Sequence, residues 1–160
     1  MVWLALLVFA GCTGKASQLA AGDRFPALNI EDLTGQAVHL PPQATAEVRL
    51  LSIRTIGCRF CASDFAELEK LYHVYSRDKL DILVINVGVE GETVHNFLRN
   101  HQVSFPVFID PKMESMKQTN TVIVPVAYLI GQDGTIVHRL EGGFSAEEIQ
   151  EILTGLGLRN

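Results

Sequence analysis

Apolar runs that alternate with helical patterns in the middle of the chain constrain its fold most strongly. Residues 48–53 are typical of a short strand, and residues 82–89 of a more apolar strand that we expect at the centre of a sheet. Each run is followed by apolar residues at helical spacing: Phe65, Leu68, Tyr72 and Tyr75 after the first, and Val94, Phe97, Leu98 and His101 after the second. This strand–helix–strand–helix order favours parallel pairing with a right-handed crossover.

The two flanks of this region follow a different pattern. Residues 25–40 are typical of a hairpin-like N-terminal element, and residues 126–130 and 135–140 flank a Gly-containing loop that predicts an antiparallel hairpin. A capping-box pattern at Ser145 opens a last helix, whose apolar stripe is Ile149, Ile152, Leu153 and Leu156. We therefore expect an α/β fold in which a central mixed sheet is flanked by helices and extended by an N-terminal β-hairpin.

Composition limits the chain to one domain and argues against nucleic acid as a partner. Its 160 residues are 48% hydrophobic, which is enough to bury one core and too much for a disordered chain. The formal net charge is −5 and no basic run occurs, whereas nucleic-acid phosphates require clustered Lys and Arg. Nucleic acid is therefore not an expected partner.

The N-terminus has the pattern of an export signal. The first charged residue is Lys15, and residues 2–10 form an apolar run that is too short to span a membrane as a finished helix. The tetrad Phe-Ala-Gly-Cys that ends at Cys12 resembles a bacterial lipobox, which implies cleavage before Cys12 and lipidation of that cysteine. A plain secretory signal and an uncleaved short anchor are the alternatives.

The resulting domain organisation has three parts. We expect a lipoprotein-type signal peptide at residues 1–11, a tether at residues 12–22 and a folded domain at residues 23–158. In the lipoprotein interpretation Cys12 is the lipid anchor of the mature chain. Each interpretation of the N-terminus places the domain outside the cytoplasm, at the periplasm or the outer face of the cell membrane.

The remaining two cysteines form the motif that carries chemistry. Cys58-Arg59-Phe60-Cys61 stands between an apolar strand and a helix, a context that favours a redox-active pair. Cys58, near the helix N-terminus, is the expected attacking thiolate, because unpaired backbone N–H groups and the helix dipole stabilise its charge. Arg59 adds a cation beside it. Cys61, one turn further in, is the expected resolving thiol.

The order of these elements resembles a known fold and family. A strand, the Cys58-x-x-Cys61 helix, a strand, a helix, and then Val124-Pro125 before a hairpin and a last helix look like the thioredoxin fold. Together with the N-terminal hairpin and the lipobox, they resemble the TlpA/ResA-like extracytoplasmic thiol-disulfide oxidoreductases over about residues 22–156.

The resemblance implies roles for further residues. Pro125 would be the cis-proline that faces the disulfide, and Val124 would pair through its backbone with a substrate strand; a trans proline in a turn is the alternative. Asp64, where ResA-like members carry a glutamate, would take or return a cysteine proton. The alternative for Asp64 is a solvated acid that the helix dipole stabilises.

Two positions depart from the family pattern. Gly57 stands where the family usually has a tryptophan, so one wall of the substrate groove is removed, and Ser52 stands where cytoplasmic thioredoxins carry a buried acid. We expect Gly57, Arg59 and Phe60, together with Val124, to contact the substrate.

These features predict a thioredoxin-like thiol-disulfide oxidoreductase. Its expected substrates are protein thiols and disulfides, for instance the cysteines of apocytochrome c, and the expected direction is reduction. A membrane-bound thiol electron donor is the second expected partner. No cofactor is expected, because the redox-active group would be the Cys58–Cys61 disulfide. The domain would be a monomer.

Two other functions remain open at this stage. The cysteine pair could bind Cu(I) through its soft sulfur ligands, which would make the protein a copper chaperone. No pair of histidines has the i, i+4 spacing of a zinc motif, and no metal site is expected. The five histidines are His39, His73, His95, His101 and His138. A thiol peroxidase would use a reactive cysteine with Thr55 and Arg54 nearby.

Overall fold

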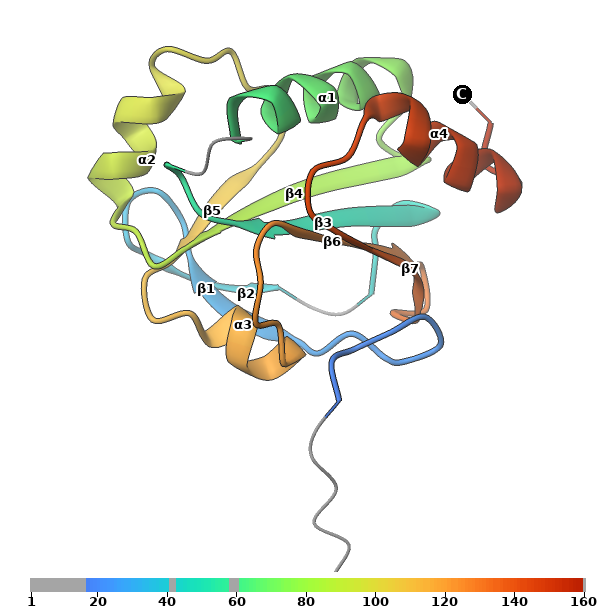
Figure 1. The fold of residues 1–160 in the computed structure, drawn as a ribbon, viewed down its shortest axis with the longest axis horizontal. Helices are drawn as coiled ribbons and strands as arrows, with labels where there is room; N and C mark the ends of the chain where they lie inside the picture. Colours follow the sequence, from blue (N-terminus) through green and yellow to red (C-terminus); the bar gives the residue numbers. More distant parts are fainter. Residues whose placement is uncertain (1–16, 41–42, 58–60, 160) are drawn as a thin grey trace, which may run out of the picture.

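The computed structural model describes residues 17–40, 43–57 and 61–159. The strands are β1 (Leu28–Glu31), β2 (Ala37–Leu40), β3 (Val48–Arg54), β4 (Leu80–Val87), β5 (Val107–Asp110), β6 (Val126–Gly131) and β7 (Ile136–Glu141). The helices are α1 (Cys61–Val74), α2 (Gly91–Leu98), α3 (Glu114–Thr119) and α4 (Ala146–Gly155). Figure 1 shows these elements arranged around one sheet.

The seven strands form one mixed sheet with the order β2-β1-β5-β4-β3-β6-β7. β3 pairs in parallel with β4 and antiparallel with β6, and β4 pairs in parallel with β5. All seven residues of β3 are buried, because β3 has a neighbouring strand on each side and cover on both faces. The parallel crossovers run through α1 and α2, as the alternating apolar runs predict.

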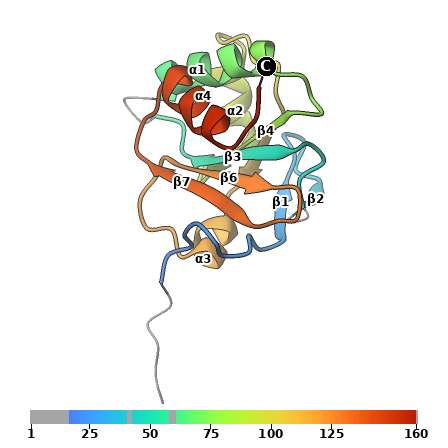
Figure 2. The same ribbon diagram turned by 90° about the vertical axis from the view of Figure 1, so that its right-hand side faces the viewer.

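Two apolar layers lie on opposite faces of the sheet. Even-numbered β3 residues such as Leu50 pack with α1 and α4, whereas odd-numbered residues such as Leu51 pack with β1, β2 and the N-terminal segment. Figures 1 and 2 show α1 and α4 on one side of the sheet and α3 on the other. The period-2 alternation of a strand thus assigns the side chains of β3 to two separate cores.

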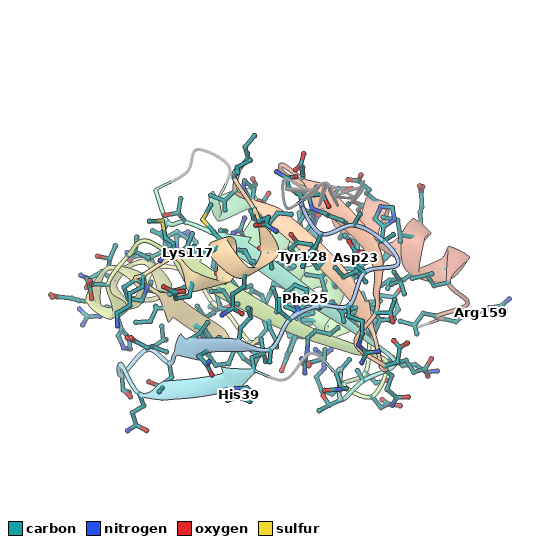
Figure 3. All side chains as sticks on the ribbon, turned by 90° about the horizontal axis from the view of Figure 1, so that it is seen from below. Asp23, Phe25, His39, Lys117, Tyr128 and Arg159 are labelled. Atoms are coloured by element: carbon teal, nitrogen blue, oxygen red, sulfur yellow. The ribbon has the colours of Figure 1, made fainter. Side chains whose placement is uncertain are left out.

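The described part of the expected tether lies against the domain. The Leu19 N–H donates to the Thr119 carbonyl at 3.4 Å, and the Gly22 N–H donates to the Ile136 carbonyl at 2.8 Å. Phe25 then packs edge-to-face on Tyr128, with ring centroids 5.2 Å apart (Figure 3). Residues 17–22 are therefore fixed to β7 and α3, which composition alone does not indicate.

Most of the expected elements are confirmed, with small differences at their ends. The mixed α/β sheet, the N-terminal hairpin and the 126–141 hairpin are present. The Ser145 Oγ accepts the Glu148 N–H at 3.1 Å, as the capping pattern predicts. Leu156 was expected on the apolar stripe of the last helix, but α4 ends at Gly155 and Leu156 is 45% exposed.

A close backbone approach at Gly91 yields a stability prediction. A Cβ on Gly91, the first residue of α2, would stand 2.9 Å from the Leu33 carbonyl oxygen. Because that atom belongs to the backbone, we expect Gly91→Ala to destabilise the fold by about 1–3 kcal/mol in urea unfolding. The control is Gly155→Ala, where the added Cβ has nothing within 4 Å and the expected change is at most a gain of about 1 kcal/mol. Equal effects of the two substitutions would contradict the close contact.

Candidate functional site

The site that the sequence predicts lies where β3 ends and α1 begins. β3 ends at Arg54 and α1 begins at Cys61. Cys12, Cys58, Arg59 and Phe60 lie outside the described residues, and only the backbone of Cys61 is described. Their roles stay predictions, while the residues around them can be placed.

Val124 and Pro125 lie beside this end of β3. The Val124–Pro125 peptide bond is cis, as the resemblance implies, so the trans alternative is wrong. β6 begins one residue later, with Val126 paired to Ile53, and the same register places Pro125 opposite Arg54. Pro125 is buried and Val124 is half-buried, whereas the preceding Val122 and Ile123 are 71% and 60% exposed. The start of β6 therefore lies next to the loop that carries the cysteine motif.

Gly57 ends the described part of that loop in a conformation that favours glycine. Its φ of +98° lies in the left-handed region, which side chains other than glycine rarely adopt. The residue is exposed, and an added Cβ would have nothing within 4 Å. The surface beside the cysteine motif is therefore open at Gly57, where the family pattern has a large aromatic side chain.

Asp64 is buried in the first turn of α1. It is 3% exposed, and its Oδ2 accepts a hydrogen bond from the Nη2 of Arg54, which is itself fully buried. Asp64 also lies at a cleft of about 500 Å³ whose other lining residues are Ser63, Glu67, Gly143, Phe144, Ser145 and Glu148. The solvated alternative for Asp64 is wrong, because the side chain is enclosed by β3 and by the segment before α4.

Burial raises the pKa of the Asp64 carboxyl above its ordinary value of 3.8, since the charged form loses hydration. The positive charge of Arg54 and its hydrogen bond act in the opposite direction, and the nearby negative charge of Glu67 raises the pKa further. Asp64 thus combines the two properties that a proton acceptor needs, which are enclosure and an elevated pKa.

Arg54 is the residue of this site that sequence reasoning missed as a partner of Asp64. Its guanidinium carbon lies 4.9 Å from the centroid of the Phe65 ring, so the cation at the end of β3 packs against an aromatic ring of α1. The available signal was an arginine at the end of a mainly apolar strand, ten positions before the acid with which it pairs. The long-range pairing itself has no local pattern.

The histidines do not gather into a metal site. Across the described ranges, no group of three or more His, Cys, Asp or Glu residues could hold a metal ion. His39 bonds to the Asn29 side chain at 2.9 Å, and His101 stacks on Phe97 with centroids 4.0 Å apart. His73 pairs with Glu69 at 3.1 Å on α1. These contacts account for three of the five histidines as structural or surface residues.

The buried ion pair yields a second stability prediction. We expect Arg54→Met to lower the free energy of unfolding by about 3–5 kcal/mol, because it leaves the Asp64 carboxylate buried without a cation. The double variant Arg54→Met/Asp64→Asn should recover part of this loss, since no uncompensated charge remains. Arg49→Met is the matched control at the other end of β3, where the partner Asp81 is 20% exposed and the loss should be smaller. Equal losses in the single and double variants would contradict this account.

The same pair predicts the pH dependence of stability. Because the folded pKa of Asp64 is raised, the folded state binds this proton more tightly than the unfolded state, and the contribution of Asp64 to stability falls as the pH rises from 3.8 through the folded pKa. Arg54→Met removes the charge that opposes the shift, so in this variant the fall should extend to higher pH. Urea midpoints measured from acid to neutral pH test the direction.

Comparison with known proteins identifies the family. The model of the AhpC/TSA family matches residues 21–139. The thiol-disulfide oxidoreductase ResA of Bacillus cereus is 24% identical over 146 residues, which cover 91% of this chain and 84% of that protein.

Solved structures share the fold. A structure from Chlorobium tepidum described as a thiol:disulfide interchange protein DsbE has a TM-score of 0.76 at 20% identity and covers 86% of this chain and 97% of that one. The exposed lipoprotein thioredoxin Etrx1 of Streptococcus pneumoniae has a TM-score of 0.66 at 15% identity and covers 81% of this chain and 99% of that one. The fold is thioredoxin-like. The chain therefore belongs to the AhpC/TSA family, and it is an oxidoreductase similar to the ResA thiol-disulfide oxidoreductases.

Proposed function

We propose that the protein is an extracytoplasmic thiol-disulfide oxidoreductase that reduces disulfides of other proteins through Cys58 and Cys61. One observation carries the proposal. α1 begins at Cys61, beyond the carboxyl end of the buried central strand β3, and the start of β6 after Pro125 is paired with that same end. A rigid sheet thus supports the cysteine motif beside a segment on which a substrate strand can lie.

Cys58 begins the reaction. It precedes the first turn of the 14-residue helix α1, where unpaired N–H groups and the helix dipole favour a thiolate. The thiolate attacks one sulfur of the substrate disulfide. A bond forms between Cys58 and that sulfur, the substrate disulfide breaks, and the other substrate sulfur leaves as a thiolate.

Cys61 completes the exchange with Asp64 as proton acceptor. The Cys61 thiol gives its proton to the Asp64 carboxylate, and its sulfur attacks the Cys58 sulfur of the mixed disulfide. The bond between Cys58 and the substrate sulfur breaks, that sulfur leaves as a thiolate, and the Cys58–Cys61 disulfide forms. Two electrons pass to the substrate, and a membrane-bound thiol electron donor reduces the pair again.

The substrate lies along the segment before β6. The backbone of Val124 pairs with an extended substrate strand, as in other complexes in which a strand is added to a sheet edge. The exposed Val122 and Ile123 offer apolar contacts next to it, and the absence of a side chain at Gly57 leaves space beside the cysteine motif. Arg59 and Phe60, between the cysteines, complete the contacts with the substrate.

A lipid on Cys12 holds the domain at the outer face of a membrane. Nowhere in the described ranges is a helix long and apolar enough to span a bilayer. Residues 17–25 run along the face of the sheet that carries α3, away from α1 (Figure 1). An anchor on that side leaves the cysteine helix facing away from the anchored segment. The structurally similar protein Etrx1 is described as an exposed lipoprotein thioredoxin, which supports the proposal of a lipid anchor.

Serine substitutions at the two cysteines test the chemistry. We expect Cys58→Ser to lower the rate of insulin reduction at least about a thousandfold, because the attacking thiolate is lost. Cys61→Ser should accumulate the mixed disulfide with substrate, which a non-reducing gel detects. His73→Ala, on the exposed side of α1, is the matched control and should keep the wild-type rate.

Three results would redirect the assignment. Full activity of Cys58→Ser would overturn the role of that cysteine. Rapid oxidation of Cys58 by peroxide without insulin reduction would establish the thiol peroxidase, and stoichiometric Cu(I) bound by the reduced pair would establish the copper chaperone.

Substitution of Cys12 tests the anchor separately. In cells that express the full chain, we expect Cys12→Ala to abolish incorporation of labelled palmitate and to change the fractionation of the protein, because lipidation requires this thiol. The wild-type chain should be labelled and sediment with membranes. A wild-type chain that is unlabelled and secreted would indicate a plain signal peptide, and one that is unlabelled and retained would indicate an uncleaved anchor.

A further inference from the structure

Buried polar atoms without a protein partner are concentrated beneath the start of α1. Five of the six such side-chain atoms among the described residues belong to Ser52, Arg54 and Asn86. Ser52 and Arg54 alternate onto the same face of β3, and Asn86 is the β4 residue in register with Arg54. A cluster of buried polar side chains between mainly apolar strands calls for an explanation other than apolar packing.

Arg54 connects this cluster to the cysteine helix. Its Nη2 donates to Asp64 Oδ2, and the relative exposure of the two side chains is 0% and 4%. Asp64 follows Cys61 by three residues, so the two positions lie on the same side of α1, one turn apart. Arg54 thus contacts Asp64, which lies one helical turn from the position of the resolving cysteine Cys61.

Stability alone does not account for the pair. Bringing a guanidinium and a carboxylate out of water offsets most of their attraction, and well-packed apolar side chains would stabilise the same space equally well or better. The neighbours of Arg54 on β3, from Val48 to Ile53, show that the strand is otherwise built mainly from apolar residues. A gain in stability over an apolar replacement is therefore not a sufficient reason for a buried charge at this position.

We propose that Arg54 is a positioning residue of the exchange site: its buried guanidinium fixes the Asp64 carboxylate beneath the first turn of α1 and acts on the reaction of Cys61 only through that carboxylate. The inference rests on the proposed function, in which Asp64 accepts the Cys61 proton. It adds a residue that the exchange chemistry itself does not require.

The groups around Asp64 make Arg54 the decisive charge. Arg54 faces it from β3, Glu67 lies one turn along α1, and Glu148 of α4 lines the same cleft. Arg54 is the only cation among these three. The other carboxylate oxygen, Oδ1, points towards Gly143, where an added Cβ would come within 3.3 Å. Arg54 therefore holds one oxygen while the other faces the segment that borders the cleft.

The role of Arg54 should be visible on the acid side of the pH–rate profile of the resolving step. Burial and the nearby negative charge of Glu67 favour protonated Asp64, and among the described side chains it is Arg54 that favours the ionised form, which can accept a proton. Without Arg54 the pKa of Asp64 rises further, so Asp64 stays protonated to higher pH and cannot accept the Cys61 proton there. The rate of the resolving step should then require a higher pH.

The test measures the pH profile of the resolving step in single-turnover reactions with a peptide disulfide. We expect Arg54→Met to move the acid limb upward by about one pH unit, which is about a tenfold loss of rate on that limb. Arg54→Lys keeps the positive charge and should keep the limb near its wild-type position. Arg49→Met is the control for loss of a β3 arginine at the other end of the strand, on the opposite face from Arg54, and its profile should be unchanged.

The Asp64→Asn background decides whether Arg54 acts through Asp64. Asp64→Asn and Arg54→Met/Asp64→Asn should have the same pH profile, and the double variant carries no uncompensated carboxylate that would prevent folding. A profile that shifts between these two variants would overturn the proposal, since Arg54 would then act on the thiol directly. An acid limb that does not move in folded Arg54→Met would overturn it as well.

A readout that does not depend on activity separates this proposal from the proposed function. NMR titration of the Asp64 carboxyl carbon should give a higher pKa in Arg54→Met than in wild type. A wild-type protein that titrates as expected but does not reduce disulfides would contradict the proposed function only. A wild-type protein that reduces disulfides but whose Asp64 titration is unaffected by Arg54→Met would contradict the role of Arg54 only.

Discussion

The rest of the structure depends on the complete burial of β3. With β4 and β6 as neighbours and apolar layers on both faces, this strand has no exposed residue, and its direction fixes where the chain turns into α1. Packing of α1 against the even-numbered face then requires Phe65 and Leu68 to point into the sheet. Because Phe65 and Leu68 fix the orientation of the helix, Asp64 lies at the edge of the helix–sheet contact. Arg54, the last residue of β3, lies at the same edge and pairs with it. The position of the acid thus follows from the packing of the core.

The alternating elements were predictable because each has a local cause. The period-2 and period-3.6 apolar patterns, the Gly-containing turn and the Ser145 cap all act within a few residues, and the structure confirms them. The sequence also indicated an acid in the first turn of the cysteine helix. Whether Asp64 was solvated was not predictable, since its burial depends on the segment at Gly143, about eighty residues away in the chain.

The missed contacts share the same physical reason. The pairing of Arg54 with Asp64 and the attachment of residues 17–22 to β7 both join segments that no local pattern relates. A polar, small-residue composition is typical of a tether, but Leu19 and Phe25 supply apolar side chains that the face around Tyr128 can bury. Leu156 shows the opposite case, in which an apolar residue at helical spacing lies beyond the end of the helix and remains exposed.

The location of the acid distinguishes this chain from the thioredoxin pattern. Ser52, at the strand position where cytoplasmic thioredoxins carry a buried acid, is fully buried and cannot exchange a proton at ordinary pH. The carboxylate stands instead on α1, at a cleft that also contains the N-terminus of α4. An acid on the strand would lie in the sheet–helix interior, whereas Asp64 borders this cleft. At this position enclosure and the charge of Glu67 favour the protonated acid, and the Arg54 guanidinium opposes both effects.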